Sequence, residues 1–396
     1  MFADRTNWNL EANVLSRELT RYRAAGKGLI DLTASNPTEC GFKYDLGAIL
    51  QAVANPGARN YSPEPKGLAV AREAVAQYYA ARKIALPIDD IVLTTSTSEA
   101  YSFVFRMLCN PGDEILIPEP SYPLFAFLAE IQDVALRRYP LIYDYGWQID
   151  FHRLEGTITD RTRAAVVVHP NNPTGHFTKL AEIQKLNRIC AEHNLAVIAD
   201  EVFLDFALGD ELQTSFAVDS PVLTFTTSGL SKISGLPQMK AAWLITSGPE
   251  QLKSRALERL EVIADTYLSM NTPVQLAMPV LLAQRHAFHE QVMARVRNNL
   301  AELDRQLVLQ KICSRLELEA GWYALLRVPA TKPDEDLAID LLNRKGIYVH
   351  PGHFYDFPAD GFLVLSLITK EEDFATGVKL LLSIFPKSEE ERRNVV

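Results

Sequence analysis

Lys232 lies among small and hydroxyl-bearing side chains between two apolar, strand-like runs, 221–225 and 241–245. Serines and glycines occupy positions 228, 229, 231, 234 and 235. A lysine held in a pocket of this kind loses hydration, which lowers the pKa of its amine and makes the amine a nucleophile towards carbonyl groups. Because most lysines are exposed, a solvated loop lysine is the alternative that this stretch alone leaves open.

A carboxylate ends another apolar run. Asp200 directly follows residues 195–199, where a charge is costly unless it meets a cation. A protonated pyridine nitrogen is such a cation, and a carboxylate beside it keeps it charged. That charge makes pyridoxal phosphate an electron sink. Asp200 and Lys232 together therefore favour chemistry on that coenzyme.

Hydroxyl groups follow the strand-like run 91–95 at the point where a helix is expected to begin. Ser96, Thr97 and Ser98 would combine with free backbone N–H groups and the positive end of the helix dipole to bind a phosphate. The alternative is a helix N-cap with Glu99 as its capping partner, which needs no ligand.

Two further segments end strand-like runs. Tyr122 follows residues 114–118 between prolines, and it is expected to hold an aromatic ring at the same rim, with core packing as the alternative. Asn172 lies in a rigid polar loop after residues 164–169, where its amide can donate to an anionic oxygen. A plain turn is the alternative there, although six consecutive turn-forming residues exceed what a turn needs.

Short apolar runs alternate with helical periodicity through the first two thirds of the chain. Strands are expected at 29–33, 91–95, 114–118, 164–169, 195–199 and 222–225, and helices at 13–25, 67–82, 99–108, 122–131 and 180–193. Continuous apolar strands are typical of a three-layer α/β fold, in which helices cover both faces of a mostly parallel sheet. Ligands of such sheets bind beyond the carboxyl ends of the strands, so the five polar segments should meet at one site.

The last third of the chain changes order, which predicts a second, smaller α+β domain. Helices are expected at 249–264, 273–310, 334–345 and 371–385, and strands at 315–319, 323–328 and 362–368. The predicted division is an N-terminal segment, 1–45, that joins the small domain, a large domain, 46–285, and a C-terminal small domain, 286–396. The charged end, 386–396, is expected to fray.

Composition excludes several classes of protein. The 396 residues are 47% hydrophobic and 22% charged, as in an ordinary soluble globular protein. A net charge of -9 argues against a nucleic-acid partner. Four scattered cysteines without zinc-ligand spacing favour reduced thiols in a cytoplasmic protein that binds no metal. The first residues lack the pattern of a signal peptide, and no apolar run approaches the roughly 20 residues that a membrane span needs.

The order of these segments resembles the fold type I, class I/II pyridoxal-phosphate aminotransferases over nearly the whole chain. The resemblance rests on Tyr61, Ser96-Thr97-Ser98, Tyr122, Asn172-Pro-Thr-Gly, Asp200 and Ser231-Lys232. The family implies that Lys232 forms the Schiff base and carries the proton, that Asp200 pairs with the pyridine nitrogen and that Asn172 donates to the ring oxygen. It also implies that Tyr122 stacks on the ring and that the three hydroxyls of residues 96–98 bind the phosphate. Tyr61 would reach the phosphate of a neighbouring subunit, which implies a homodimer.

The chain departs from the family pattern around the coenzyme. Phe203 stands where the family usually has a tyrosine, so a hydrogen bond to the ring oxygen is lost. Lys240 stands where an arginine usually meets the phosphate, and it supplies the charge without the bidentate fork. Gly229 replaces a common serine. The change at Phe203 predicts a raised pKa of the imine between Lys232 and the coenzyme. The change at Lys240 predicts weaker but surviving phosphate binding, and Thr227 or Ser228 is expected to compensate for Gly229.

A larger departure concerns the substrate. Val364 occupies the position of the arginine that usually clamps the substrate α-carboxylate, and the segment at Ser35 and Asn36 is altered too. Losing that clamp removes a charge-assisted pair worth about 1.5–3 kcal/mol. Three explanations are open: Arg327 or another arginine replaces the clamp, the substrate is an amine or an unusual amino acid, or a bond other than Cα–H is broken. His353 is a candidate for the substrate side, with loop packing as its alternative.

Three functions are compatible with these observations. The first is an aminotransferase that moves an amino group between an amino acid or amine and a 2-oxo acid. The second is a lyase or decarboxylase that uses pyridoxal phosphate on the same scaffold. The third is a regulator that binds the coenzyme without catalysis. The complete set of catalytic residues from Asn172 to Lys232 counts against the regulator, and the missing carboxylate clamp keeps the lyase open.

Overall fold

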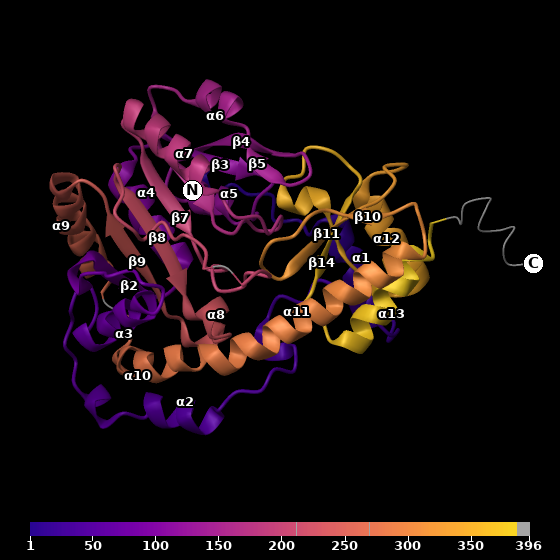
Figure 1. The fold of residues 1–396 in the computed structure, drawn as a ribbon, viewed down its shortest axis with the longest axis horizontal. Helices are drawn as coiled ribbons and strands as arrows, with labels where there is room; N and C mark the ends of the chain where they lie inside the picture. Colours follow the sequence, from indigo (N-terminus) through magenta and orange to yellow (C-terminus); the bar gives the residue numbers. More distant parts are fainter. Residues whose placement is uncertain (211, 269, 386–396) are drawn as a thin grey trace, which may run out of the picture.

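The computed structural model describes residues 1–210, 212–268 and 270–385 (Figure 1). The end that was expected to fray, 386–396, lies outside the described residues. Among the described residues, no helix is both long enough and apolar enough to cross a membrane. All four cysteines are free thiols, and three of them are buried.

An eight-stranded sheet forms the centre of the larger part of the molecule. Its strands, in spatial order, are β2 (Ile91–Thr94), β9 (Ala242–Ser247), β8 (Thr224–Gly229), β7 (Ala196–Asp200), β6 (Thr162–Val168), β3 (Glu114–Glu119), β4 (Ala135–Tyr143) and β5 (Trp147–Ile149). The central strands β8, β7, β6, β3 and β4 run parallel, whereas β9 is antiparallel to both of its neighbours and β5 is antiparallel to β4. The predicted mostly parallel sheet is confirmed, although β4 and β5 were not predicted.

Helices cover both faces of this sheet. On one face lie α4 (Thr97–Leu108), α5 (Phe125–Glu130) and α9 (Glu250–Tyr267), and on the other lie α6 (Phe151–Thr157), α7 (Leu180–Glu192), α3 (Ala69–Ala80) and α10 (Thr272–Ala283). Strand β6 shows why: Ala164 and Val166 pack with the first group, and the alternating Ala165 and Val167 pack with the second. A strand buried on both faces must be apolar throughout, so the three-layer prediction is confirmed.

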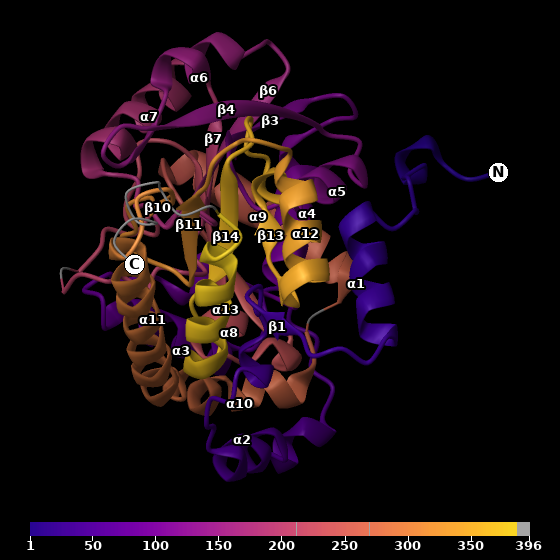
Figure 2. The same cartoon turned by 90° about the vertical axis from the view of Figure 1, so that its right-hand side faces the viewer.

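A smaller α+β part packs beside the large sheet (Figures 1 and 2). Its sheet has the order β10 (Ser314–Arg315), β11 (Tyr323–Arg327), β14 (Phe362–Ser366) and β13 (His350–Pro351). Strand β1 (Ile30–Asp31) pairs in parallel with β12 (Ile347–Tyr348), which brings the N-terminal segment against the C-terminal elements. The helices of this part are α1 (Val14–Ala24), α12 (Asp334–Lys345) and α13 (Glu371–Leu382).

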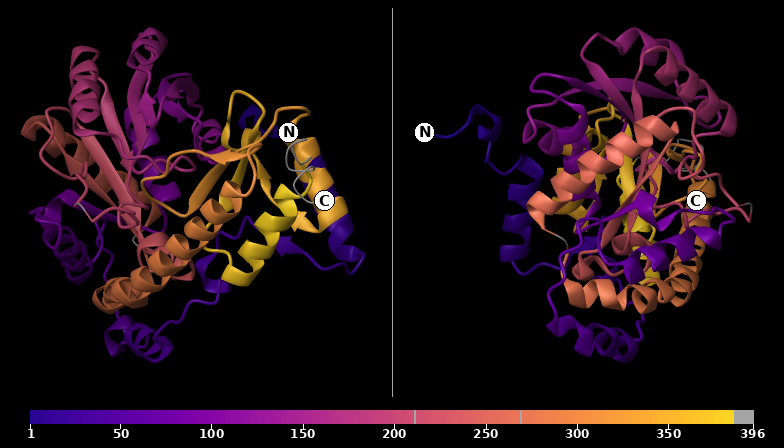
Figure 3. Two further views of the ribbon diagram at one scale, coloured as in Figure 1. Left: turned by 45° about the vertical axis from the view of Figure 1, so that its right-hand side comes forward. Right: turned by 90° about the vertical axis from the view of Figure 1, so that its left-hand side faces the viewer.

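Two long predictions need correction. The helix expected over 273–310 is two helices, α10 and α11 (Arg285–Val308), which meet at Gln284. Helix α11 runs from the large sheet towards the small one (Figure 3). The strand expected over 315–319 is the two-residue strand β10. Its residues Ser314 and Arg315 pair with β11, opposite Arg327 and Leu326. Helix α2 (Leu46–Val53), which packs on α10, was not predicted.

Short helices complete the structure. A single turn of α-helix, α8 (Leu230–Ile233), follows β8. Turns of 3-10 helix occur at Asp4–Thr6, Pro37–Glu39, Pro56–Arg59, Ile88–Asp90, Pro237–Met239 and Gly352–Tyr355.

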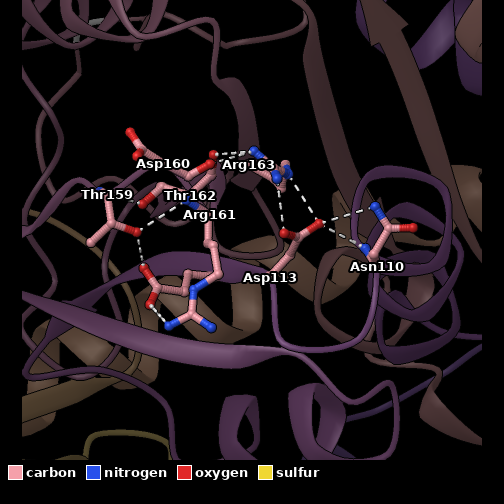
Figure 4. Close-up of polar contacts among 8 residues, drawn as sticks. Asn110, Asp113, Thr159, Asp160, Arg161, Thr162 and Arg163 are labelled. Carbon is pink, nitrogen blue, oxygen red and sulfur yellow. Dashed lines mark hydrogen bonds and ion pairs between the residues drawn. The ribbon is translucent and has the colours of Figure 1, made fainter.

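A polar network fastens the amino ends of β3 and β6 (Figure 4). The guanidinium of Arg163 donates to both carboxylate oxygens of Asp113, at 2.9 and 3.0 Å, and this pairing lowers the pKa of Asp113. The hydroxyl of Thr159 donates to Glu114 at 2.6 Å. Bidentate pairs between arginine and carboxylate fix geometry, so the network ties the start of β3 to β6 at the point where the register of the two strands shifts.

Candidate active site

A cavity opens beyond the carboxyl ends of the parallel strands, and nine of the predicted site residues line it. They are Ser35, Thr97, Ser98, Tyr122, Asn172, Asp200, Phe203, Ser231 and Lys232. Lys232 and Asp200 share this cavity, which is the condition that the predicted coenzyme chemistry required. The alternative of a solvated loop lysine is therefore wrong.

Lys232 projects from α8, directly after β8 ends at Gly229. Its Nζ lies 5.1 Å from the centre of the Trp322 ring and 5.7 Å from that of Phe203. Burial lowers the pKa of the amine to about 8, although the charge of Asp200 opposes the shift. An amine with a pKa near the working pH can act both as a nucleophile and as a proton carrier.

Asp200 is the last residue of β7 and is held by two hydrogen bonds. Its Oδ1 accepts from the backbone N–H of Val202 at 3.1 Å, and its Oδ2 accepts from the hydroxyl of Tyr101 at 3.1 Å. Burial raises the pKa of Asp200 to about 6, while these hydrogen bonds and the charge of Lys232 lower it. A buried carboxylate of this kind is suited to pairing with a cationic ligand atom.

The N-terminus of α4 faces the same cavity. Thr97 and Ser98, in its first turn, line the cavity. The first backbone N–H groups of a helix have no partner within the helix and can bind an anion. Ser96 is the N-cap: its Oγ accepts from the backbone N–H of Glu99 at 3.1 Å, and the Glu99 carboxylate accepts from Thr95 N–H at 2.6 Å. The capping alternative therefore describes Ser96, which does not line the cavity, because its hydroxyl is turned towards its own helix.

Asn172 is presented by a tightly bonded loop. The backbone N–H of Gly175 donates to Asn171 O at 2.8 Å, and the hydroxyl of Thr174 donates to Asn171 Oδ1 at 2.9 Å. Asn172 itself is buried, and within the described part of the chain its Oδ1 has no hydrogen-bond partner. A buried polar atom without a partner costs about 1–3 kcal/mol, so a donor on a ligand that reached Oδ1 would recover that cost. The predicted hydrogen bond to an anionic ring oxygen uses the other atom of the amide, Nδ2.

Replacing Gly175 by alanine should destabilise the protein by more than about 2 kcal/mol. Gly175 has φ +68°, and an added Cβ would lie 2.4 Å from the carbonyl oxygen of Ala320. Both the backbone strain and the clash act on the Asn172 loop, so coenzyme affinity should fall as well. Denaturant unfolding measures the loss, with Gly156→Ala as the control because a Cβ there meets no atom within 4 Å. Equal stability of the two variants would contradict the prediction.

Two tyrosines in the cavity were not predicted. Tyr101 lies one helical turn after Thr97 on α4, a spacing that places both on one face and could have revealed it. Tyr323 begins β11 in the small sheet, is buried, and hydrogen-bonds Ser35. No local signal marks Tyr323, because it reaches the cavity from a different sheet.

Several predicted residues lie outside the lining of the cavity. Lys240 is exposed in a left-handed backbone conformation after a 3-10 turn, and His353 is exposed on its loop. Asn36 caps the turn Pro37–Glu39 by accepting from Thr38 N–H at 3.2 Å. Tyr61 is 72% exposed. These residues are not brought together with Lys232 within this one chain.

Val364 is buried in β14, opposite Leu325 of β11. In the described parts of the chain, no arginine lines the cavity. Arg327 sits at the far end of β11, with its guanidinium 5.8 Å from the ring of Tyr143 and 5.9 Å from that of Phe362. The structure therefore does not bring Arg327 into the clamp position.

The residues that are present fit pyridoxal phosphate. The cavity offers an amine with a lowered pKa, a buried carboxylate, the hydroxyl-bearing start of a helix and the side-chain amide of Asn172 as a donor. Phe203 is 2% exposed and lines the cavity with an apolar ring. As the sequence predicted, this position supplies no hydroxyl group.

Residues 27–374 match the family described as aminotransferase class I and II, so the chain belongs to that family. Members of this family are enzymes that depend on pyridoxal phosphate, and the predicted transaminase of fold type I is confirmed.

Individual relatives cover nearly the whole chain. Alanine aminotransferase of Mycobacterium tuberculosis (strain ATCC 25618 / H37Rv) is 30% identical over 376 residues, which are 91% of this chain and 86% of the relative. Glutamate-pyruvate aminotransferase AlaA of Escherichia coli (strain K12) is 27% identical over 364 residues, 89% of each chain. Among solved structures, alanine aminotransferase from Pyrococcus furiosus has a TM-score of 0.87 at 22% identity, with 97% of this chain and 99% of that chain covered.

Proposed function

We propose that this aminotransferase binds pyridoxal 5'-phosphate in the cavity and attaches it to Lys232. The observation that carries the proposal is that Lys232 and Asp200, from the ends of two neighbouring parallel strands, line one cavity. When bound, the coenzyme supplies an electron sink for a carbanion at the substrate α carbon. The protein supplies the groups that orient it and move protons.

Each of the lining residues has one task in this proposal. The amine of Lys232 takes the proton from the substrate α carbon and returns it on the coenzyme side, for which a pKa of about 8 is suited. The carboxylate of Asp200 holds the pyridine nitrogen in its protonated form. Thr97 and Ser98 hold the phosphate with the first backbone N–H groups of α4. Asn172 and Tyr122 hold the ring in place.

We also propose a cytoplasmic homodimer in which Tyr61 crosses to the phosphate site of the second copy. Its exposed ring supports this, since it contacts little of its own chain. The division into segments 1–45, 46–285 and 286–396 remains part of the proposal, and the pairing of β1 with β12 supports the assignment of the first segment to the small domain.

The proposed substrates are an amino donor and a 2-oxo acid acceptor. The names of the relatives suggest alanine, glutamate or their oxo acids as one partner. The cavity wall without arginine suggests that the other partner is an amine or an unusual amino acid whose carboxylate is bound differently. A lyase or decarboxylase is the second candidate, because no arginine clamp is present among the described residues that line the cavity. That clamp decides which bond of the substrate lies perpendicular to the coenzyme ring.

A half-reaction screen tests these proposals. Purified protein is loaded with pyridoxal phosphate, mixed with single amino acids and amines, and followed by visible absorption. Transamination should bleach the band, and an added 2-oxo acid should restore it. Bleaching with release of CO₂, or without recovery, would favour the second candidate. A protein that never binds the coenzyme would defeat both.

Changing Val364 to arginine should lower the KM for ordinary α-amino acids about tenfold, because a charge-assisted pair with the carboxylate is worth about 1.5–3 kcal/mol. Val364 is 1% exposed, so Val364→Met serves as a control for the added volume without the charge. Both variants are compared by half-reaction kinetics and thermal melting. Val364 does not itself line the cavity, so only a longer side chain at this position can reach it. If the arginine and methionine variants have the same KM, the carboxylate is not bound by a side chain at position 364.

A further inference from the structure

Tyr101 projects from α4 towards the end of β7, and the Tyr101–Asp200 hydrogen bond joins the two elements. The hydroxyl of Tyr101 donates to Asp200 Oδ2 at 3.1 Å, and the side chain is 4% exposed. The ring is fixed by an edge contact with Phe125, with ring centres 5.2 Å apart, and by Phe105 at 5.9 Å. A ring held on two sides keeps its hydroxyl in one place.

The hydroxyl of Tyr101 keeps its proton, and so can donate, throughout the neutral pH range. Burial raises the pKa of Tyr101 well above its ordinary value, and the negative charge of Asp200 raises it further. The second donor to Asp200 is the backbone N–H of Val202. Tyr101 therefore provides the hydrogen bond that comes from a side chain and can be removed by mutation.

We propose that Tyr101 is a positioning residue that holds the Asp200 carboxylate in its ionised form and aims its remaining lone pairs at the pyridine nitrogen of the coenzyme. The proposal rests on the proposed function. It adds a side chain that acts on the coenzyme through its hydrogen bond to Asp200.

Helix α4 connects this role with phosphate binding. Thr97 and Ser98 lie at its start, Tyr101 follows one turn later, and all three line the cavity. The rise of an α-helix separates Thr97 and Tyr101 by about 6 Å along its axis. One rigid helix thus holds both the phosphate and the carboxylate that faces the ring nitrogen, and it fixes the distance between these two anchor points.

Two titratable side chains act directly on Asp200 among the described residues: the charge of Lys232 of α8 stabilises its ionised form, and Tyr101 of α4 donates to it. Burial and, after it, the charge of Asp200 raise the pKa of Glu201, the next residue, and of Tyr122. Removing the Tyr101 hydroxyl leaves the other three unchanged. The charged form of Asp200 then loses one donor, so the pKa of Asp200 must rise.

The test compares Tyr101→Phe with wild type and with a matched control. Tyr139→Phe also removes a hydroxyl from a fully buried tyrosine, whose hydrogen bond of 2.7 Å goes to the backbone oxygen of Val166 away from the cavity. The dissociation constant of pyridoxal phosphate is measured on the coenzyme-free protein between pH 5 and 9. The pH dependence of kcat and of KM is then measured on the protein that carries the coenzyme.

Tyr101→Phe should move the acid limb of the binding and rate profiles upward by about half to one pH unit. Because the pKa of Asp200 is about 6, coenzyme binding should then weaken about three- to tenfold at pH 5 and less than about twofold at pH 7. The sign follows from Asp200, which is protonated at a higher pH when it has one donor fewer. Tyr139→Phe should leave the midpoint in place. Tyr101→Phe with the wild-type midpoint, or with the same shift as Tyr139→Phe, overturns the inference.

A double-mutant cycle with Asp200→Asn on the coenzyme-free protein keeps the inference testable without activity. The coupling between positions 101 and 200, measured by denaturant unfolding, should be present at pH 8 and shrink at pH 5, where Asp200 is neutral. A coupling that is zero or independent of pH overturns the inference. Wild type that binds no pyridoxal phosphate overturns the proposed function, whereas wild type that binds it while Tyr101→Phe behaves identically overturns only the role of Tyr101.

Discussion

Replacing Lys232 by alanine should lower the rate of amino-group transfer by a factor of at least about 10³. The variant loses the amine that attaches the coenzyme and carries the proton at the α carbon. No second amine lines the cavity among the described residues. Single-turnover kinetics with a substrate from the half-reaction screen measure the loss, and the coenzyme should remain bound without its covalent link.

The matched control is Lys185→Ala. Lys185 is a partly buried lysine on α7 whose Nζ lies 4.7 Å from the ring centre of Phe151, so it shares the aromatic contact of Lys232 but lies outside the cavity. Its replacement should leave the rate within about twofold. A Lys232→Ala protein that turns over substrate at more than a hundredth of the wild-type rate would defeat the proposed function.

Replacing Asp200 by asparagine should lower kcat by about 10²–10³ and weaken coenzyme binding. The amide has nearly the same shape as the carboxylate, so the change removes the charge that keeps the pyridine nitrogen protonated and alters little else. Rapid-mixing half reactions measure kcat, and titration of coenzyme-free protein measures the affinity. Addition of formate should restore little activity, because the volume of the side chain is not lost.

The neighbouring carboxylate provides the comparison for Asp200. Glu201 is fully buried, accepts hydrogen bonds from the hydroxyl of Ser215 at 2.7 Å and from the backbone N–H of Phe216 at 2.5 Å, and does not line the cavity. Burial raises the pKa of Glu201 to about 7. Glu201→Gln should therefore change stability while kcat stays within a few-fold. If Asp200→Asn is no slower than Glu201→Gln, the assignment of Asp200 to the ring nitrogen is wrong.

The polar segments at five strand ends were predictable because each has a local signal. An apolar run that is followed by a charged or hydroxyl-bearing residue indicates a buried strand and the edge of the sheet at which it ends, as at Asp200 and Thr97. Parallel strands bring their carboxyl ends to one edge, so residues far apart in the chain can be assigned to one site before their distances are known. The helix at 334–345 was likewise placed within its true bounds by its periodicity.

Other features depend on contacts that no local pattern records. Strand β9 enters the sheet between β2 and β8 in the opposite direction, which an apolar run at 241–245 does not reveal. Strand β4 carries several exposed residues because it lies near the edge of the sheet, so it lacks the continuous apolar run that marked the central strands. The break between α10 and α11 likewise depends on packing.

The sequence by itself determined the layered architecture and the pair Lys232 and Asp200, because hydrophobic periodicity and the chemistry of single residues act over short stretches of chain. The family followed from the resemblance of its motifs. The tertiary structure decided that Ser96 caps its helix, that Tyr101 holds Asp200, that Tyr323 reaches the cavity from the small sheet, and that Arg327 lies away from it. These outcomes depend on which surfaces are buried against each other. Burial is a property of the packed whole, and it sets both the direction of a side chain and the pKa of the groups around it.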